Sequence, residues 1–211
     1  MCERHVWDDV GSPWEPRTCR TCTLCGAVFR DMEHYVVAQT LNMPVYSVID
    51  FGTGLKGPVA QHYWQTFKEI RKGYCCDVWK IKELPDLWIP MNVDAFDLFK
   101  ILDLESVDVV QAFGFLEHLE KEDGFRFLEM AEELAGKLVI VSAASCIHAL
   151  NEECGDDPDY KVKRDGNPYH RYNSTWGWVE LEEAGFETNW EDWMNGESFK
   201  SEVVAWKRLE G

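Results

Sequence analysis

The sequence predicts an α/β fold in which a mostly parallel, seven-stranded sheet has helices on both faces. From Val45 onward, short apolar runs alternate with longer segments of mixed polarity, as expected for strands joined by helices. The run Val107–Phe113 is short and largely apolar, which is typical of a parallel strand buried on both sides. A turn with three glycines follows the first strand, at the end where folds of this class hold their ligands.

Seven segments are expected to form the strands of this sheet. In chain order they are Val45–Phe51, Tyr74–Val78, Leu87–Val93, Val107–Phe113, Leu138–Val141, Glu187–Trp190 and Val203–Lys207. Four helices are expected as well: Asp31–Leu41, Pro58–Lys72, Gly124–Ala135, which stops at Gly136, and one that runs from a cap at Ser174 or Thr175 to Ala184, with Gly185 ending it. The polar segment Cys146–Tyr172 is too long for an ordinary connection, so we expect a lid or substrate loop there.

Length and charge narrow the possible partners. The 211 residues suffice for one such domain with a small appendage. The formal net charge of −17 opposes binding to phosphate backbones and anionic lipid, so nucleic acid is disfavoured as a partner. The N-terminus shows no apolar signal region, and no apolar stretch reaches the length of a membrane span. We therefore expect a cytoplasmic protein with no membrane association.

The strongest motif is the glycine turn that follows the strand Val48–Phe51. Gly52, Gly54 and Gly57 let the backbone approach a ligand, and the helix that follows offers unpaired N–H groups. The same pattern also fits a tight turn without any ligand. Asp77, at the end of the second strand, favours the ligand site because an acid there can accept both hydroxyls of a ribose.

Two ligand classes fit this turn. The spacing of the three glycines matches the pattern of nicotinamide-binding folds, which leaves an NAD(P)-dependent oxidoreductase as an alternative. Asp50 weighs against it, because a carboxylate two residues before Gly52 would lie close to an anionic pyrophosphate. A carboxylate in that position suits a ligand that is cationic at that end.

From Val45 to Leu209 the sequence resembles the class I S-adenosylmethionine-dependent methyltransferases, in particular those of the type 11 and type 12 kind, which have a Rossmann-like fold. The matching motifs are Asp50-Phe51-Gly52-Thr53-Gly54, Asp77 after the second strand, Asp94-Ala95 after the third, Val107 to Leu119, Lys137 to Ser142, and Glu182 to Glu187. Their order and spacing carry the resemblance. One departure is that Leu55-Lys56-Gly57 replaces the tighter Gly-x-Gly turn commonest in the family.

The resemblance implies a role in cofactor binding for eight residues. Backbone at Gly52 and Gly54 would line the methionine and ribose portion, and Asp50 would lie near the methionine amino group. Asp77 would hold the ribose hydroxyls, Asp94 would accept from the adenine amino group, and Ala95 would lie beside the ring. Phe113 and Gly114 would face the methionine side. A methyltransferase domain is therefore expected over residues 31–211.

Two histidines are candidates for a catalytic base. His118 follows the fourth strand, and His170 lies in the segment Asn167–Tyr172, which resembles the family's substrate-facing region. Either one could instead be a loop residue without a catalytic role. His148 is a weaker candidate, and His62 is expected to be structural. The family members that methylate bases in nucleic acid usually carry an Asn/Asp-Pro-Pro-aromatic tetrad where this chain has Gln111–Gly114, so we expect a small-molecule, sugar or other non-nucleic acceptor.

Residues 1–30 are expected to form a zinc-knuckle segment. Cys22 and Cys25 have the C-x2-C spacing of a zinc knuckle, and Cys2 and His5 supply a second pair. Four protein ligands would make the zinc structural, with Cys19 as a possible substitute for Cys2 or His5. The alternative is a set of free thiols. A third possibility for the whole chain is a non-catalytic binding protein that docks a partner through this knuckle. The oligomeric state stays open.

Overall fold

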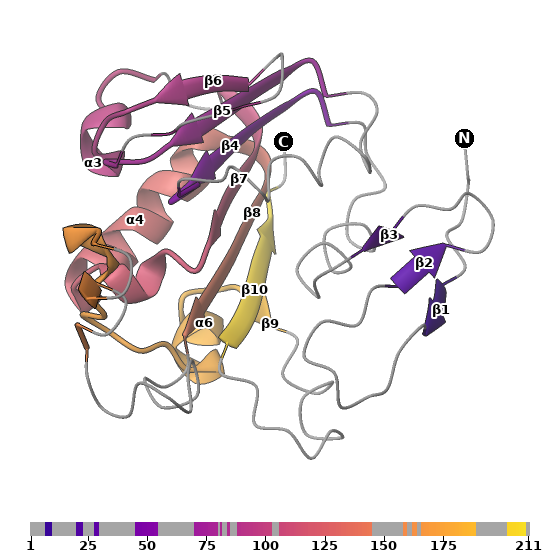
Figure 1. Ribbon diagram of the computed structural model, residues 1–211. Coiled ribbons are helices and arrows are strands. Elements are labelled where there is room, and N and C mark those ends of the chain that lie inside the picture. The colour runs from indigo at the N-terminus through magenta and orange to yellow at the C-terminus, as the bar shows by residue number, and fades with distance from the viewer. Residues whose placement is uncertain are drawn as a thin grey trace.

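The computed structural model describes residues 7–9, 20–22, 28–29, 45–54, 70–79, 81, 84, 88–102, 106–144, 158–159, 162–163, 166–188 and 202–209. Its centre is a seven-stranded sheet with the spatial order β6-β5-β4-β7-β8-β10-β9 (Figure 1). The strands are β4 (Ser47–Phe51), β5 (Lys72–Cys76), β6 (Trp88–Met91), β7 (Val107–Phe113), β8 (Ala135–Ala144), β9 (Glu187–Thr188) and β10 (Glu202–Arg208).

The sheet is mostly parallel, as predicted. Strands β4 to β8 run parallel to one another, and β10 pairs antiparallel with both β8 and β9. The chain builds outward from β4 through β5 to β6 and then returns to place β7 on the other side of β4. This reversal next to β4 opens a crevice at the carboxyl ends of β4 and β7, the usual ligand position in an open α/β sheet.

The core has two layers because successive side chains of a strand point to opposite faces. Ile49, Phe51 and Val110 pack on one face, and Val48 and Val109 pack on the other. All five side chains are at most 1% exposed, as expected for central strands that are covered on both sides. The apolar runs that predict these strands are therefore explained by burial on both faces.

The described α-helices pack on one face of the sheet (Figure 1). They are α3 (Ala95–Leu98), α4 (Lys121–Leu134) and α6 (Trp178–Glu183), and two short 3-10 turns, η1 (Leu116–His118) and η3 (Pro168–His170), lie near the carboxyl ends of the parallel strands. The helix predicted over Asp31–Leu41 and most of the one predicted over Pro58–Lys72 lie outside the described residues. The part of the chain that the structure describes contains no helix of the length and hydropathy needed to cross a membrane.

Several predicted boundaries are wrong. Lys72 begins β5 instead of ending a helix. Helix α4 begins at Lys121, and it passes directly into β8 at Ala135, so Gly136 lies in a strand and does not end the helix. The cause is non-local: Ala135 pairs with Val107 of β7, and this pairing sets its extended backbone.

The predicted cap of the last helix is also wrong. Gly177 is the N-cap of α6, and its N–H donates to Glu180 Oε2 at 2.7 Å. The Ser174 hydroxyl instead donates to the Leu116 carbonyl at 3.1 Å, so it ties the chain to η1 rather than to the helix. After α6, Gly185 has a φ of +85°, as expected for the glycine that ends a helix.

Three short strands form a separate antiparallel sheet near the N-terminus. They are β1 (Trp7–Asp9), β2 (Arg20–Cys22) and β3 (Val28–Phe29), in the order β1-β2-β3. Of the predicted zinc ligands, Cys22 ends β2, whereas Cys2, His5 and Cys25 lie outside the described residues, as does Cys19. Among the residues that are described, no cluster of three or more His, Cys, Asp or Glu side chains is arranged to hold a metal.

Candidate active site at the carboxyl ends of the parallel strands

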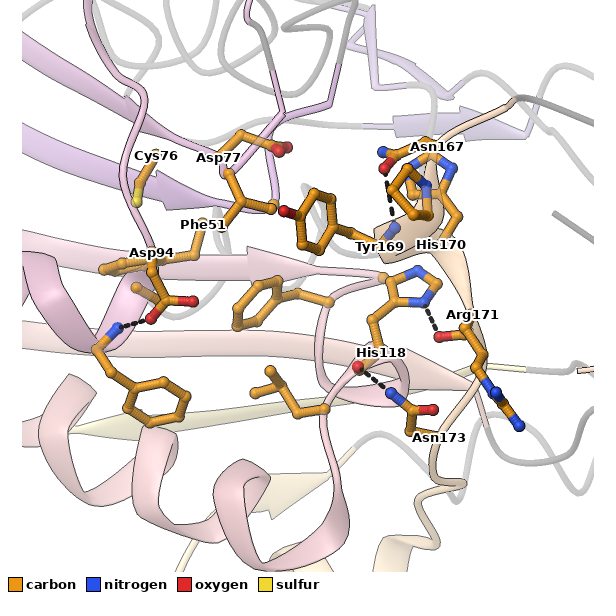
Figure 2. A pocket seen from close by; sticks show the side chains of 18 of the residues that line it. Phe51, Cys76, Asp77, Asp94, His118, Asn167, Tyr169, His170, Arg171 and Asn173 are labelled. Atoms are coloured by element: carbon orange, nitrogen blue, oxygen red, sulfur yellow. Dashed lines mark hydrogen bonds between the residues drawn. The ribbon is translucent and has the colours of Figure 1, made fainter. Parts of the chain in front are cut away.

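A pocket opens where β4, β5, β6 and β7 end, beside the η1 and η3 turns (Figure 2). Phe51 and Gly52 line it from β4, Asp77 from β5, and Gly114 from β7. The start of α3, the residues around η1 and the segment from Asn167 to Asn173 supply the remaining walls. The pocket therefore lies at the reversal of strand order that the topology creates.

The glycine turn has a conformation that requires glycine. Gly52 and Gly54 have φ values of +70° and +68°, a region that other residues rarely adopt. A Cβ atom on Gly52 would lie 2.7 Å from Cδ2 of Phe115, which is closer than two carbon atoms can approach. The N–H of Gly52 donates to the Cys76 carbonyl at 2.9 Å.

Asp77 connects this turn to the end of β5. Its Oδ2 accepts from the N–H of Gly54 at 2.7 Å, and its Oδ1 accepts from the N–H of Trp79 at 2.7 Å. An ionised carboxylate has about four acceptor positions, so each oxygen has a second one for a ligand hydroxyl. The two backbone bonds fix the carboxylate in place before any ligand arrives.

Asp94 is held in a similar way at the start of α3. It is the N-cap of this helix, and its Oδ1 accepts from the N–H of Phe96 at 2.8 Å. Ala95 beside it is buried, whereas Asp94 is exposed toward the pocket that both residues line. Because the cap uses Oδ1 and fixes the carboxylate, the second oxygen of Asp94 has a defined direction.

His118 lies between two other rings on the opposite side of the pocket. Its ring stacks on His170 with centroids 5.5 Å apart and on Tyr172 with centroids 5.3 Å apart. Its Nδ1 lies 2.8 Å from the carbonyl oxygen of Arg171. A carbonyl only accepts, so Nδ1 carries the hydrogen and the neutral imidazole has its lone pair on Nε2.

The segment after η3 holds η1 through a set of hydrogen bonds. The Asn173 N–H donates to the Glu117 carbonyl at 2.8 Å, and the Asn173 side chain donates to the His118 carbonyl at 2.8 Å (Figure 2). The Ser174 N–H also reaches the Glu117 carbonyl, at 3.2 Å. These contacts join residues more than fifty positions apart and fix the backbone that carries His118.

The side chain of Asp50 is buried in the centre of the sheet and does not line the pocket. It alternates with Ile49 and Phe51, so it lies on the face opposite α4. Burial raises its pKa to about 7; Gln111 and Thr53 lower it in part, and the charge of Asp77 raises it further. Its Oδ2 has no hydrogen-bond partner among the residues that the structure describes, which is costly for an ionised carboxylate.

The cysteine in the pocket is not a nucleophile. Cys76 lines the pocket, and burial together with three nearby aspartates raises the pKa of its thiol far above the usual range. Burial likewise raises the pKa of the neighbouring Cys75 to about 12. Both thiols therefore stay protonated near neutral pH, and neither is available for covalent chemistry.

Seven of the residues singled out in the sequence line this one pocket: Gly52, Asp77, Asp94, Ala95, Gly114, His118 and His170. Gly54, Asp50 and Phe113 do not line the pocket. Gly54 is connected to it by the hydrogen bond from its N–H to Asp77, which does line the pocket. His62 and His148 lie outside the described residues. Sequence reasoning missed Phe115, Tyr169 and Asn173, since nothing in a single sequence distinguishes a pocket-lining side chain in a loop from a solvent-exposed one.

Comparison with known proteins shows the fold. In sequence, the chain matches no protein-family model and no curated protein. In structure, it is similar to an O-methyltransferase family protein from Burkholderia thailandensis, with a TM-score of 0.54 and 13% identity over 84% of this chain and 55% of that one. The present chain thus spans little more than half of that protein.

Two further structures match over most of their length. A SAM-dependent methyltransferase from Archaeoglobus fulgidus has a TM-score of 0.53 and 15% identity, over 86% of this chain and 96% of that one. Magnesium protoporphyrin IX methyltransferase from Synechocystis, solved with bound SAH (S-adenosylhomocysteine), has a TM-score of 0.50 and 17% identity, over 84% and 80%. The chain therefore has the fold of the S-adenosylmethionine-dependent methyltransferases.

Proposed function

We propose that this chain is an S-adenosylmethionine-dependent methyltransferase that acts on a small-molecule, sugar or other non-nucleic acceptor. The observation that carries the proposal is the use of the glycine N–H groups. In a dinucleotide site such groups bind a phosphate, but here Gly54 donates to Asp77 and Gly52 donates to the Cys76 carbonyl. These two glycine N–H groups are therefore not available to an anion.

The residues of the pocket fit this cofactor. The carboxylates of Asp77 and Asp94 lie on one side of the pocket and suit a cationic ligand with a ribose and an adenine. Asp77 has acceptor positions for the two ribose hydroxyls, and Asp94 has one for the adenine amino group. Backbone at Gly52 and Gly114 would line the methionine portion.

In this proposal the chain's own residues align the acceptor with the methyl group and remove a proton from the acceptor. When bound, the cofactor supplies an electrophilic methyl group on its sulfonium sulfur and leaves as a neutral thioether. The pocket walls orient the acceptor against this methyl group and exclude water. His118 accepts the acceptor's proton on Nε2, because its Nδ1 hydrogen is held by the Arg171 carbonyl. His170, stacked on His118, is the second candidate for this role.

Calorimetry separates this proposal from its rivals. SAH should bind the purified chain and NADH should not. Binding of NADH alone would assign the site to an oxidoreductase. Binding of SAH without any turnover of S-adenosylmethionine, across a broad panel of small-molecule and sugar acceptors, would instead favour a non-catalytic binding protein.

For residues 1–30 we propose one structural zinc ion held by Cys2, His5, Cys22 and Cys25, with residues 31–211 as the catalytic domain. Supporting this, Cys22 pairs with Trp7 in the small sheet, and Trp7 follows His5 by two positions in the sequence. The end of β2, at Cys22, is thus paired with the start of β1, which follows His5 closely in the sequence. The C-x2-C and C-x2-H spacings are those of tetrahedral zinc sites.

A further inference from the structure

The most exposed aromatic ring in the pocket belongs to Tyr169. Figure 2 shows this ring projecting into the pocket, with its hydroxyl on the side of Asp77. The residue is nonetheless 54% exposed. A large ring that is uncovered inside a concave site offers apolar surface for a ligand to bury.

The η3 turn fixes the direction of this ring. The Asn167 side chain caps the turn, and its Oδ1 accepts from the Tyr169 N–H at 3.0 Å. Asn167 is itself buried, at 4% exposure, and Pro168 restricts the backbone that follows. The turn sends its next two side chains in different directions, since His170 stacks on His118 while Tyr169 does not contact that ring.

Tyr169 faces the side of the pocket where Asp77 lies. Its ring meets the Trp79 ring edge-on, with centroids 6.3 Å apart and an interplanar angle of 61°. The N–H of Trp79 is one of the two donors that hold the Asp77 carboxylate. Tyr169 and Asp77 therefore line the same side of the pocket, and Trp79 contacts both of them, through its ring and its backbone N–H.

We infer that the ring of Tyr169 binds the nucleoside part of the cofactor. This inference rests on the proposed function, which supplies a ligand with a ribose and a planar base. A planar base gains from contact with an aromatic face, and the exposed ring of Tyr169 provides one beside Asp77. The hydroxyl of Tyr169 is not needed for this contact, so the ring alone accounts for the effect.

The test uses two probes, SAH and adenosine, the second measured as a competitor of SAH. Tyr169→Ala should weaken both by the same factor, roughly 10-fold or more, the usual cost of removing a ring that stacks on a base. Tyr169→Phe should bind both as the wild type does, within about twofold. Tyr46→Ala is the matched control, because Tyr46 is 41% exposed but precedes β4 at the opposite edge of the sheet.

Each result shows whether or not Tyr169 contacts the nucleoside part of the cofactor. Weaker SAH binding with unchanged competition by adenosine would place the ring on the amino-acid side and overturn the inference. Unchanged affinity for both probes, or a loss as large in Tyr169→Phe as in Tyr169→Ala, would overturn it too, as would adenosine that fails to displace SAH from the wild type. Failure of the wild type to bind SAH would instead remove the proposed function itself.

Discussion

Asp77 accepts a hydrogen bond from the backbone N–H of Gly54 at 2.7 Å, and this contact joins the ends of two neighbouring parallel strands. In the proposed function the same carboxylate also holds the cofactor's ribose, so that one side chain would both shape the glycine turn and bind the ligand. Removal of this carboxylate should therefore change the conformation of the glycine turn as well as the affinity for SAH.

Asp77→Ala should weaken SAH binding by about 1.5–3 kcal/mol, the range for hydrogen bonds to a charged group. Calorimetry measures this directly. Asp97→Ala serves as the control, because Asp97 lies nearby on α3 but is exposed and forms an ion pair with the exposed Lys100. Equal affinity in Asp77→Ala and wild type would show that the ribose is held elsewhere.

His118→Ala should lower the rate of methyl transfer by roughly 10²–10⁴-fold, the usual range for loss of a general base. Cofactor affinity should change little, since the ring lies with His170 and Tyr172, away from Asp77 and Asp94. Single-turnover methylation across pH, with an acceptor found by screening, checks this. A near wild-type rate with an unchanged pH profile would move the assignment to His170 or to no residue.

Asp50→Asn should stabilise the chain above pH 7. The folded state raises the pKa of Asp50 from its usual 3.8 to about 7, so the folded chain binds the proton more tightly than the unfolded chain between these values. Wild-type stability should therefore fall as pH rises from about 4 to 7 and then level off. The rise of the Asp50 pKa to about 7 corresponds to a loss of at most about 4 kcal/mol in the free energy of unfolding.

The measurement for Asp50 is urea unfolding at several pH values. The variant should gain most at pH 8 and least near pH 4, where the wild-type carboxyl is protonated in both states. A gain that does not depend on pH would mean that the substitution acts through packing alone.

Gly124→Ala should destabilise the fold, although alanine is the better helix former. A Cβ atom on Gly124 would clash with Cζ2 of Trp176, which is fully buried and cannot move aside. Overpacking of this kind costs about 1–3 kcal/mol. Gly136→Ala is the control, because its new Cβ would meet only ordinary contact at 3.6 Å. Denaturant unfolding that ranks the two variants in the reverse order would contradict this explanation.

Purified protein should contain about one zinc ion per chain, since one tetrahedral site uses four ligands. Cys22→Ser should release the metal and leave SAH binding nearly unchanged. Elemental analysis of protein prepared without chelator provides the measurement. Cys75→Ser is the matched control, because Cys75 lies buried in β5 and is not among the proposed ligands. A wild type without zinc would remove the proposed site.

The strands could be predicted from sequence because their signal is local. Val107–Phe113 and the strand before Gly52 are apolar runs, and the structure confirms both. The junction of α4 and β8 could not be predicted, since it depends on the pairing of Ala135 with Val107, 28 positions earlier.

The candidate site likewise has residues that could be predicted from the sequence and residues that could not. Asp77 and Asp94 follow strands directly, so their positions at the sheet edge can be inferred from the chain order. The contact of His118 with His170 and the role of Asn173 arise from a segment more than fifty residues away. No spacing in the sequence encodes which loop folds back over which turn.

The hydrogen bonds that tie Asn173 and Ser174 to η1 have a consequence for how this protein can diversify. They anchor the chain immediately downstream of the η3 turn to the same backbone that carries His118. Pro158 and Asp159 also contact this segment, through the Tyr172 N–H and the Arg171 side chain. Changes in the sequence between β8 and Pro158 are therefore expected to leave that histidine in place. In evolution or in engineering, that upstream part of the chain is thus open to exchange, while His118 and the pocket keep their geometry.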